Sequence, residues 1–180
     1  MTLPATPDLG EVLAVLERTP PTLAALLDGL PRSWLEADEG PDTFSPIQVL
    51  GHLIHGERTD WMVRVHAILE HGESRPFEPF DRFAHQGSLA GRGVRDLLSE
   101  FGTLRAANTA ALRGLDLTTA DFSRRGRHPE FGSVTLGQLL ATWVVHDVSH
   151  LGQIARVMAR RYETAVGPWR AYFRVFQNSG

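Results

Sequence analysis

Two histidines spaced four residues apart carry the clearest chemical signal in this chain. His146 and His150 stand in the segment 141–162, whose other residues have the apolar pattern of a buried helix. In a helix, side chains at this spacing lie on one face, one turn apart. Two neutral imidazoles placed in this way can bind one metal ion together. The alternative is that each histidine is a core residue that only completes a hydrogen bond.

The apolar face around this pair bears on the choice between a metal site and two core histidines, but it leaves both possibilities open. Helical spacing of 100° per residue places His150 within the apolar stripe and His146 on its shoulder. Two cationic imidazoles there repel each other and are poorly solvated, whereas a shared metal ion binds the neutral rings. The stripe consists of Leu136, Leu139, Leu140, Trp143, Ile154, Val157 and Met158.

A third ligand has to come from another part of the chain. The segment 45–70 has the pattern of a second helix, and His52 occupies an apolar stripe on it. His55 falls on the polar face of the same helix, where a histidine is normally just solvated. Helical geometry therefore favours His52 as the partner of the pair. The remaining histidines lie on that polar face, at a helix end or in loops, and these are His66, His71, His85 and His128.

Composition removes several kinds of chemistry. The chain has 180 residues, a net charge of −3, no cysteine and no lysine, so thiolate, disulfide and Schiff-base chemistry are excluded. The negative net charge gives no sign of a nucleic-acid-binding surface. No run of apolar residues reaches the length that spans a membrane. The N-terminal residues lack the features of an export signal, so we expect a cytoplasmic protein. We expect a single domain over residues 1–180.

Apolar periodicity predicts an all-α fold with four long helices. The segment 8–30 is expected to bend or restart at Pro20 and Pro21. Connections of 15–20 residues leave the helix order in a four-helix bundle open. A short amphipathic tail helix is expected at 169–176. A surplus apolar face on 45–70 and this aromatic tail predict a homodimer. The other helices are expected at 89–115 and at 135–167, and no strand pattern is found.

Three known kinds of catalytic site fit the sequence poorly. The string from His146 to His150 is similar to the zinc-peptidase motif His-Glu-x-x-His, but it has aspartate in the glutamate position. A ferritin-like di-iron site needs Glu-x-x-His, which does not occur. The Gly-x-Ser-x-Gly elbow of serine hydrolases is also missing.

Two stretches of the chain resemble the DinB/YfiT-like superfamily of bacterial metal-binding four-helix proteins. These are SPIQVLGHLIHGERTDW and TLGQLLATWVVHDVSHLGQIARV, with the strongest likeness at His52-Leu53 and at 146–154. The resemblance implies that one histidine of the second helix and two of the fourth bind a divalent metal ion. Carried over, these are His52, His146 and His150. It implies zinc or nickel, with iron as a further option.

The resemblance also implies a class of function. Members of the superfamily include transferases that use bacillithiol or mycothiol and a mycothiol-dependent maleylpyruvate isomerase. The expected function is a metal-dependent S-transferase of a low-molecular-weight thiol, or a related hydrolase. Its partners would be a small-molecule electrophile and bacillithiol or a similar thiol, which fits a chain without cysteine. The alternative is a non-catalytic metal-binding or stress-associated homodimer.

Several polar residues near the predicted ligands have open roles. Asp147 lies on the apolar stripe, where an unpaired carboxylate is costly. It is a candidate to orient a ligand such as His52 or to act as a base, and a plain hydrogen bond to a neighbouring helix is the alternative. Glu57 and Gln153 occupy positions typical of the family without an assigned role. The aromatic loop 73–88 is predicted to pack down as a lid, with Phe80, Asp81 and Arg82 as candidates for the pocket mouth.

Overall fold

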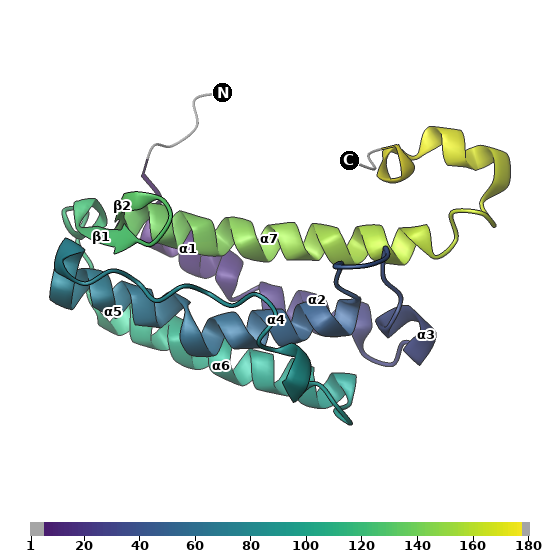
Figure 1. Cartoon of the computed structure of the whole chain (residues 1–180), viewed down its shortest axis with the longest axis horizontal. Coiled ribbons are helices and arrows are strands. Elements are labelled where there is room, and N and C mark those ends of the chain that lie inside the picture. Colours follow the sequence, from purple (N-terminus) through teal and green to yellow (C-terminus); the bar gives the residue numbers. More distant parts are fainter. Residues whose placement is uncertain (1–5, 178–180) are drawn as a thin grey trace.

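The computed structural model describes residues 6–177 as four helical rods with a β-hairpin at one end (Figure 1). The second rod packs against both the third and the fourth rods. The predicted all-α four-helix bundle is therefore confirmed. The rods are α1 (Leu9–Leu16) with α2 (Thr19–Leu27), α4 (Pro46–Thr59) with α5 (Trp61–His71), α6 (Val94–Gly114), and α7 (Leu136–Arg160).

The helices that carry the candidate histidines begin as the sequence predicts. Ser45 accepts a hydrogen bond from the Gln48 amide, and the Gln48 side chain accepts one from the Ser45 amide. Thr135 and Gln138 form the same reciprocal pair at the start of α7. These capping boxes fix where α4 and α7 begin, and so fix which faces of the two helices meet.

Several helix boundaries differ from the sequence-based expectation. The first rod breaks between Leu16 and Thr19, and Pro20 and Pro21 lie in the first turn of α2, where proline is tolerated. The second rod breaks at Asp60, which has φ −120° and ψ −71°. No proline or glycine marks this break. The fourth helix ends at Arg160 instead of reaching residue 167.

The prediction that the connection 116–134 has no strand was wrong. It folds into an antiparallel hairpin of β1 (Arg125–His128) and β2 (Gly132–Thr135). Gly126 packs so closely that a Cβ there would lie 2.6 Å from atoms of Ile68 and Phe77. Strands of four residues are too short to produce a readable alternation, and the hairpin is held by packing on α5.

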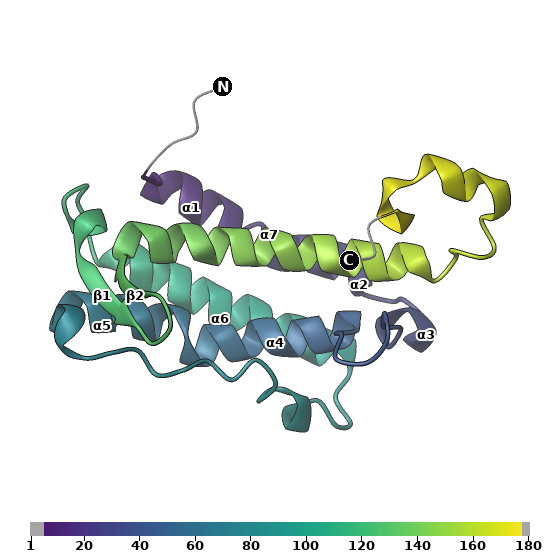
Figure 2. The ribbon, with the colours of Figure 1, turned by 45° about the horizontal axis from the view of Figure 1, so that its top comes forward.

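Short elements fill the remaining connections and the C-terminal segment. Helix α6 begins later than predicted, because Gly91 has a positive φ of 73° and Gly93 is the N-cap. Figure 2 shows the C-terminal segment running past the end of α7 and turning back toward the last turns of that helix, which it contacts. It consists of 3-10 turns and not of one tail helix. The short elements are α3 (Arg32–Leu35), η1 (Gly72–Ser74), η2 (Gln86–Ser88), η3 (Asp121–Ser123), η4 (Gly167–Tyr172) and η5 (Arg174–Phe176).

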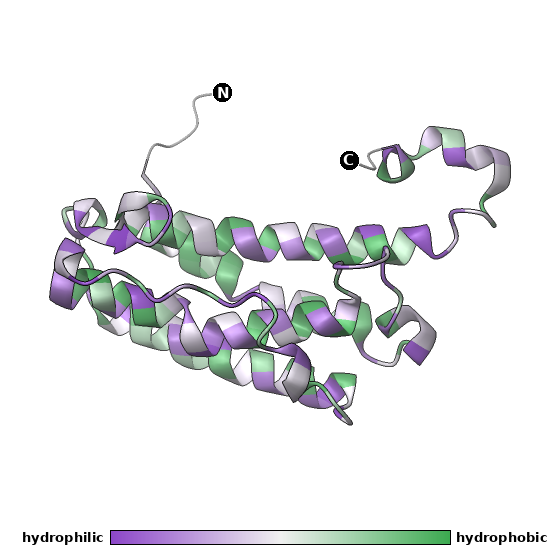
Figure 3. Ribbon diagram, in the orientation of Figure 1, coloured by the Kyte–Doolittle hydropathy of each residue, from purple (hydrophilic) through white to green (hydrophobic). Residues whose placement is uncertain are grey.

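Two apolar clusters form the core, and the candidate site lies between them along α7. Trp143 belongs to the cluster around α1 and α5, and Ile154 belongs to the cluster around α2 and α4. Figure 3 shows apolar and polar residues interspersed along α7. Within residues 6–177, no helix is long and apolar enough to cross a membrane.

Candidate metal centre

The three histidines predicted as ligands meet in one place between α4 and α7. The Nε2 atom of His146 lies 3.1 Å from Nε2 of His52 and 3.2 Å from Nε2 of His150. One ligand nitrogen of each of the three residues lies within 4.8 Å of the others. Among residues 6–177, this is the one group of three or more histidine and carboxylate side chains with such spacing.

The outward-facing ring nitrogens of two of these histidines have hydrogen-bond partners. Nδ1 of His52 lies 3.3 Å from the carbonyl oxygen of Arg82, and Nδ1 of His150 lies 2.8 Å from Oε1 of Gln153. Because both partners are acceptors, Nδ1 carries the proton in each neutral ring. The Nε2 lone pairs of His52 and His150 therefore both face His146.

Burial keeps two of the three rings neutral. Desolvation, followed by the charges of His150 and His146, lowers the pKa of His52 to about 3. Desolvation and the charge of His146 lower the pKa of His150 to about 4. At neutral pH both imidazoles are in the unprotonated form that binds metal ions.

These lowered pKa values predict acid sensitivity of the metal-free fold. The unfolded chain takes up protons at its histidines below the ordinary pKa of 6.5, while folded His52 and His150 stay neutral until about pH 3 and 4. Stability must then fall as the pH drops through 6.5. We expect the free energy of unfolding to decrease by on the order of 5 kcal/mol between pH 7 and pH 4.5 from these two groups.

Urea unfolding in the presence of a chelator measures this effect. The double variant His52→Gln, His150→Gln is the control, because the carboxylates that also titrate in this range are common to both proteins. Its stability should fall less steeply with pH than that of the unaltered chain. Equal slopes for the two proteins would contradict the prediction.

Asp147 forms a buried ion pair with a residue that the sequence did not single out. Arg105 of α6 donates to Oδ2 of Asp147 at 2.5 Å and to Oδ1 at 3.0 Å. Oδ1 also lies 4.0 Å from Nδ1 of His146. Burial acts to raise the pKa of Asp147, and the contacts with His146 and Arg105 more than offset it, so this pKa lies below its ordinary value. The residue beside Asp147 is His146, whereas His52 faces the Arg82 carbonyl.

Glu57 completes the same buried network. Arg105 donates to Glu57 Oε1 at 2.7 Å, and the indole Nε1 of Trp143 donates to that oxygen at 3.2 Å. Asn108 donates to the other carboxylate oxygen at 2.9 Å. Two carboxylates thus share one guanidinium in the interior. Glu57 and Gln153, whose roles the sequence left open, therefore both have hydrogen-bond partners. Glu57 belongs to this network, and Gln153 is the partner of His150.

The segment 73–88 covers the histidine cluster from one side. The Phe77 amide donates to the carbonyl of Arg127 at 2.9 Å, which ties the segment to the hairpin. The ring of Phe80 lies 5.5 Å from that of His52 in an edge-on contact. Arg82 supplies the carbonyl for His52, and its guanidinium stacks over the rings of Phe44 and Phe83. Asp81 is exposed and accepts from the Phe83 amide.

The other histidines stay outside the cluster. The ring of His55 lies 5.0 Å from that of Phe80, and His128 lies in the hairpin. His85 is buried, with its ring 5.0 Å from that of Phe44 and 5.6 Å from that of His52. His66 and His71 are exposed on α5. Helix-face geometry therefore separated His52 from His55 correctly as neighbours of the pair.

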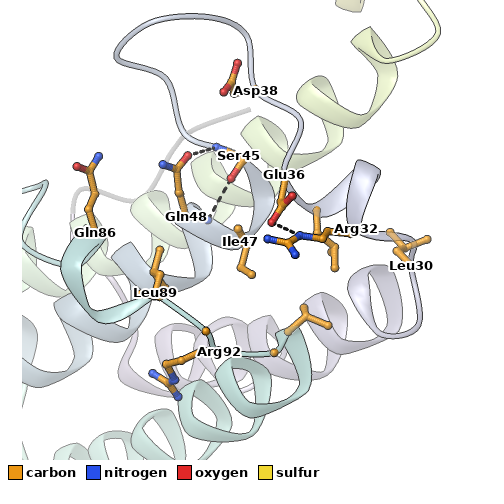
Figure 4. Close-up of a pocket in the computed structure, with 15 residues that line it drawn as sticks. Leu30, Arg32, Glu36, Asp38, Ser45, Ile47, Gln48, Gln86, Leu89 and Arg92 are labelled. Carbon is orange, nitrogen blue, oxygen red and sulfur yellow. Dashed lines mark hydrogen bonds and ion pairs between the residues drawn. The ribbon is translucent and has the colours of Figure 1, made fainter.

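Two cavities differ in their relation to the cluster. One of about 730 Å³ lies between α3 and the start of α6, and Figure 4 shows two local pairs among its polar side chains, Arg32 with Glu36 and Ser45 with Gln48. The other, of about 420 Å³, lies between the start of α5, the hairpin turn and the segment 73–88. It is lined by His146 and therefore adjoins the cluster.

Comparisons with known proteins agree with this architecture. No curated protein gives a significant match. Among solved structures, the chain is similar to YfiT from Bacillus subtilis, with a TM-score of 0.75 and 22% identity over 89% of this chain and 93% of that chain. YfiT is described as a probable metal-dependent hydrolase with an unusual four-helix bundle topology. The sequence model of the DinB superfamily matches residues 15–154, so this chain belongs to the DinB superfamily.

Proposed function

We propose that this protein is a metal-dependent enzyme whose divalent ion is held by His52, His146 and His150. The observation that carries the proposal is the meeting of three Nε2 atoms at 3.1 and 3.2 Å. Ligand nitrogens bound tetrahedrally to zinc at 2.0–2.1 Å stand about 3.3 Å apart. The spacing of the imidazoles therefore suits a small divalent ion.

The hydrogen bonding of the three rings supports a cation more than a purely structural cluster. His52 and His150 both present lone pairs to His146, and a proton on Nε2 of His146 can serve only one of them. In that tautomer, Nδ1 of His146 would be an acceptor without a donor, and it is buried without a hydrogen bond. With a cation between the rings, Nδ1 of His146 carries a proton and faces the Asp147 carboxylate.

The residues around the histidines would position and shield the ion. Asp147 is a positioning residue for His146, and the carbonyl of Arg82 and the amide of Gln153 do the same for His52 and His150. Phe80 limits the access of water from the side of the lid segment. A divalent ion with open coordination positions supplies Lewis-acid chemistry, in which it acidifies a thiol or water and polarises a carbonyl group.

We assign the reaction to transfer of a low-molecular-weight thiol to an electrophile, or to a related hydrolysis. Three neutral histidines without a fourth protein ligand are typical of catalytic sites. The thiol has to be a cosubstrate, since the chain has no cysteine. The description of YfiT as a probable metal-dependent hydrolase supports the hydrolytic alternative. Zinc and nickel both suit imidazole ligands.

Two assays on metal-loaded protein test the proposal. We expect fluorescence to rise when bacillithiol and monochlorobimane are added, or p-nitrophenyl acetate to be hydrolysed in the absence of thiol. Either activity should disappear with a chelator and in His150→Ala, and it should persist in His55→Ala, which alters a histidine outside the cluster. If the loaded protein shows neither activity, the enzyme proposal fails and a non-catalytic metal-binding role replaces it.

A further inference from the structure

Arg105 uses every N–H group of its side chain inside the bundle. A guanidinium carries five such donors in one rigid plane. Nε and Nη2 donate to Oε1 of Glu57 at 3.1 and 2.7 Å, and Nη1 donates to the carbonyl of Leu16 at 2.8 Å. The remaining two N–H groups, one on Nη1 and one on Nη2, donate to the two carboxylate oxygens of Asp147. The position and the orientation of the guanidinium are therefore fixed.

The two acidic partners of Arg105 lie on the two helices that carry the predicted metal ligands. Glu57 is in α4, five residues after His52, and Asp147 is in α7, directly after His146. Arg105 itself is in α6. One side chain from a third helix thus links α4 to α7 beside the histidine cluster.

The distance between α4 and α7 decides whether the three histidines can share one ion. His146 and His150 lie on the same helix, so helical geometry fixes their relation. His52 reaches the pair from the other helix, and its Nε2 lies 3.1 Å from Nε2 of His146. Metal–nitrogen distances in proteins vary by only about 0.2 Å around their preferred value. A shift of α4 relative to α7 therefore weakens the site at His52 first.

Arg105 also fixes the carboxylate that faces His146. Because both oxygens of Asp147 lie in the fork of the guanidinium, the carboxylate cannot turn away. Its Oδ1 lies 4.0 Å from Nδ1 of His146, which is buried without a hydrogen bond. A histidine that binds a metal ion normally donates its other ring N–H to such an acceptor. Asp147 is thus held where that acceptor is needed.

Neither stability nor charge alone accounts for this network. Replacing a complete buried ion network by apolar residues of similar volume is often neutral or stabilising. A lysine would supply the same positive charge, but its three donors on one nitrogen cannot form the forked contact with a carboxylate. What Arg105 adds is a fixed geometry, since its plane binds Glu57 along one edge and Asp147 along another.

We propose that Arg105 is a positioning residue of the metal centre. It holds α4 and α7 at the spacing at which His52 reaches the ion together with His146 and His150, and it holds Asp147 in place to orient His146. This role rests on the proposed function, because it takes the three histidines as the metal ligands. Arg105 acts through its two carboxylate partners and not by contact with the ion.

The affinity and the spectrum of bound metal ions test this role in Arg105→Lys, which keeps the charge and loses the fork. We expect the dissociation constant for Zn²⁺, measured by competition with a coloured chelator, to rise about ten- to a hundredfold. Co²⁺ is the spectroscopic probe, because its visible absorption depends on the geometry of its ligands. The absorption bands of bound Co²⁺ should change in position and intensity in Arg105→Lys.

Leu112→Ala is the control for a general loosening of the fold. Leu112 is fully buried on the same helix, two turns after Arg105, and outside the hydrogen-bonded network. The substitution destabilises the fold by removing apolar contacts, which urea unfolding measures. At urea-free conditions where circular dichroism shows both variants folded, Leu112→Ala should bind Zn²⁺ and Co²⁺ as the unaltered chain does.

Glu57→Gln and Asp147→Asn extend the test should Arg105→Lys fail to fold. Both keep the volume of the side chain and remove one charged acceptor of Arg105. Each should weaken Zn²⁺ binding. The effect of Glu57→Gln is the more specific, because Glu57 has no contact with the ligand histidines among the hydrogen bonds of the described residues. Combining Asp147→Asn with Arg105→Lys should weaken binding by less than the product of the two single effects, since both act on one network.

Three results would overturn the proposal. These are an unchanged Zn²⁺ affinity and Co²⁺ spectrum in Arg105→Lys, an equal loss of affinity in Leu112→Ala, and unchanged affinity in both Glu57→Gln and Asp147→Asn. The unaltered chain is titrated alongside the variants. Absence of metal binding there would refute the assignment of the histidines, whereas unaltered binding in the variants would refute only the role of Arg105.

Discussion

Replacing His146 with alanine should abolish stoichiometric metal binding, with the affinity for Zn²⁺ or Ni²⁺ lowered at least about a hundredfold. His146 is the central member of the cluster, since its Nε2 contacts Nε2 of both His52 and His150. Its loss leaves two ligands on different helices with no nitrogen between them. Even the loss of a residue that only supports a ligand typically lowers metal affinity about ten- to a hundredfold, so the loss of a ligand should lower that affinity further.

Elemental analysis and competition with a coloured chelator measure this change. His55→Ala is the matched control, because His55 lies on the same helix as His52, one turn away, and outside the cluster. In the presence of chelator, unfolding of His146→Ala should stay within about 1 kcal/mol of the unaltered chain, since the ring is partly exposed and forms no hydrogen bond through Nδ1. Full metal content in His146→Ala would show that His146 is not a metal ligand.

The helix faces on which the three histidines lie followed from the sequence because helical period is a local property, whereas the pairing of His52 with His146 and His150 came from the family resemblance. Residues 146 and 150 share a face whatever the rest of the chain does. His52 and His55 are three residues apart, so their side chains point in directions about 60° apart around the helix. This angle separates a buried from a half-exposed position. Each helix start was equally local, since Ser45 and Thr135 form their caps with residues three positions ahead.

Features that depend on contacts between distant segments were not predictable in the same way. The break at Asp60 has no proline or glycine to mark it in the sequence. The hairpin is too short to show alternation, and it is held by Gly126 against Ile68 and Phe77. The cavity beside His146 needs all of these parts at once.

Arg105 is a different case, because the signal was present in the sequence. The buried face of α6 runs through Leu97, Phe101, Arg105, Thr109 and Leu112, with steps of three or four residues. An arginine in the middle of such a stripe has to find buried acidic partners. Asp147 lies on the apolar stripe of α7, and a carboxylate there likewise needs a buried partner of opposite charge. The two residues could have been paired across the bundle by this argument alone.

Replacing Arg105 with methionine should therefore lower the free energy of unfolding by about 3–5 kcal/mol at pH 7. The guanidinium is 1% exposed and forms ion pairs with Glu57 and Asp147, whose side chains have no exposed surface. Methionine fills much of the same space, but it leaves two buried carboxylates without a cation. Arg95→Met is the control, since its pair with Asp28 is exposed and screened by solvent, so its loss should change the free energy of unfolding much less.

The pH dependence of this loss identifies its cause. In the unaltered chain the pKa of Asp147 lies below its ordinary value, so the ion pair contributes stability above that value and loses it as the pH falls. Without Arg105, burial favours the protonated carboxyl. The difference in stability between the two proteins should then shrink between pH 7 and pH 5 in urea unfolding. Adding Asp147→Asn to Arg105→Met should restore part of the loss at pH 7, since it removes one unpaired charge. A deficit that is equal at both pH values and is not relieved by Asp147→Asn would assign the effect of Arg105 to packing instead of charge.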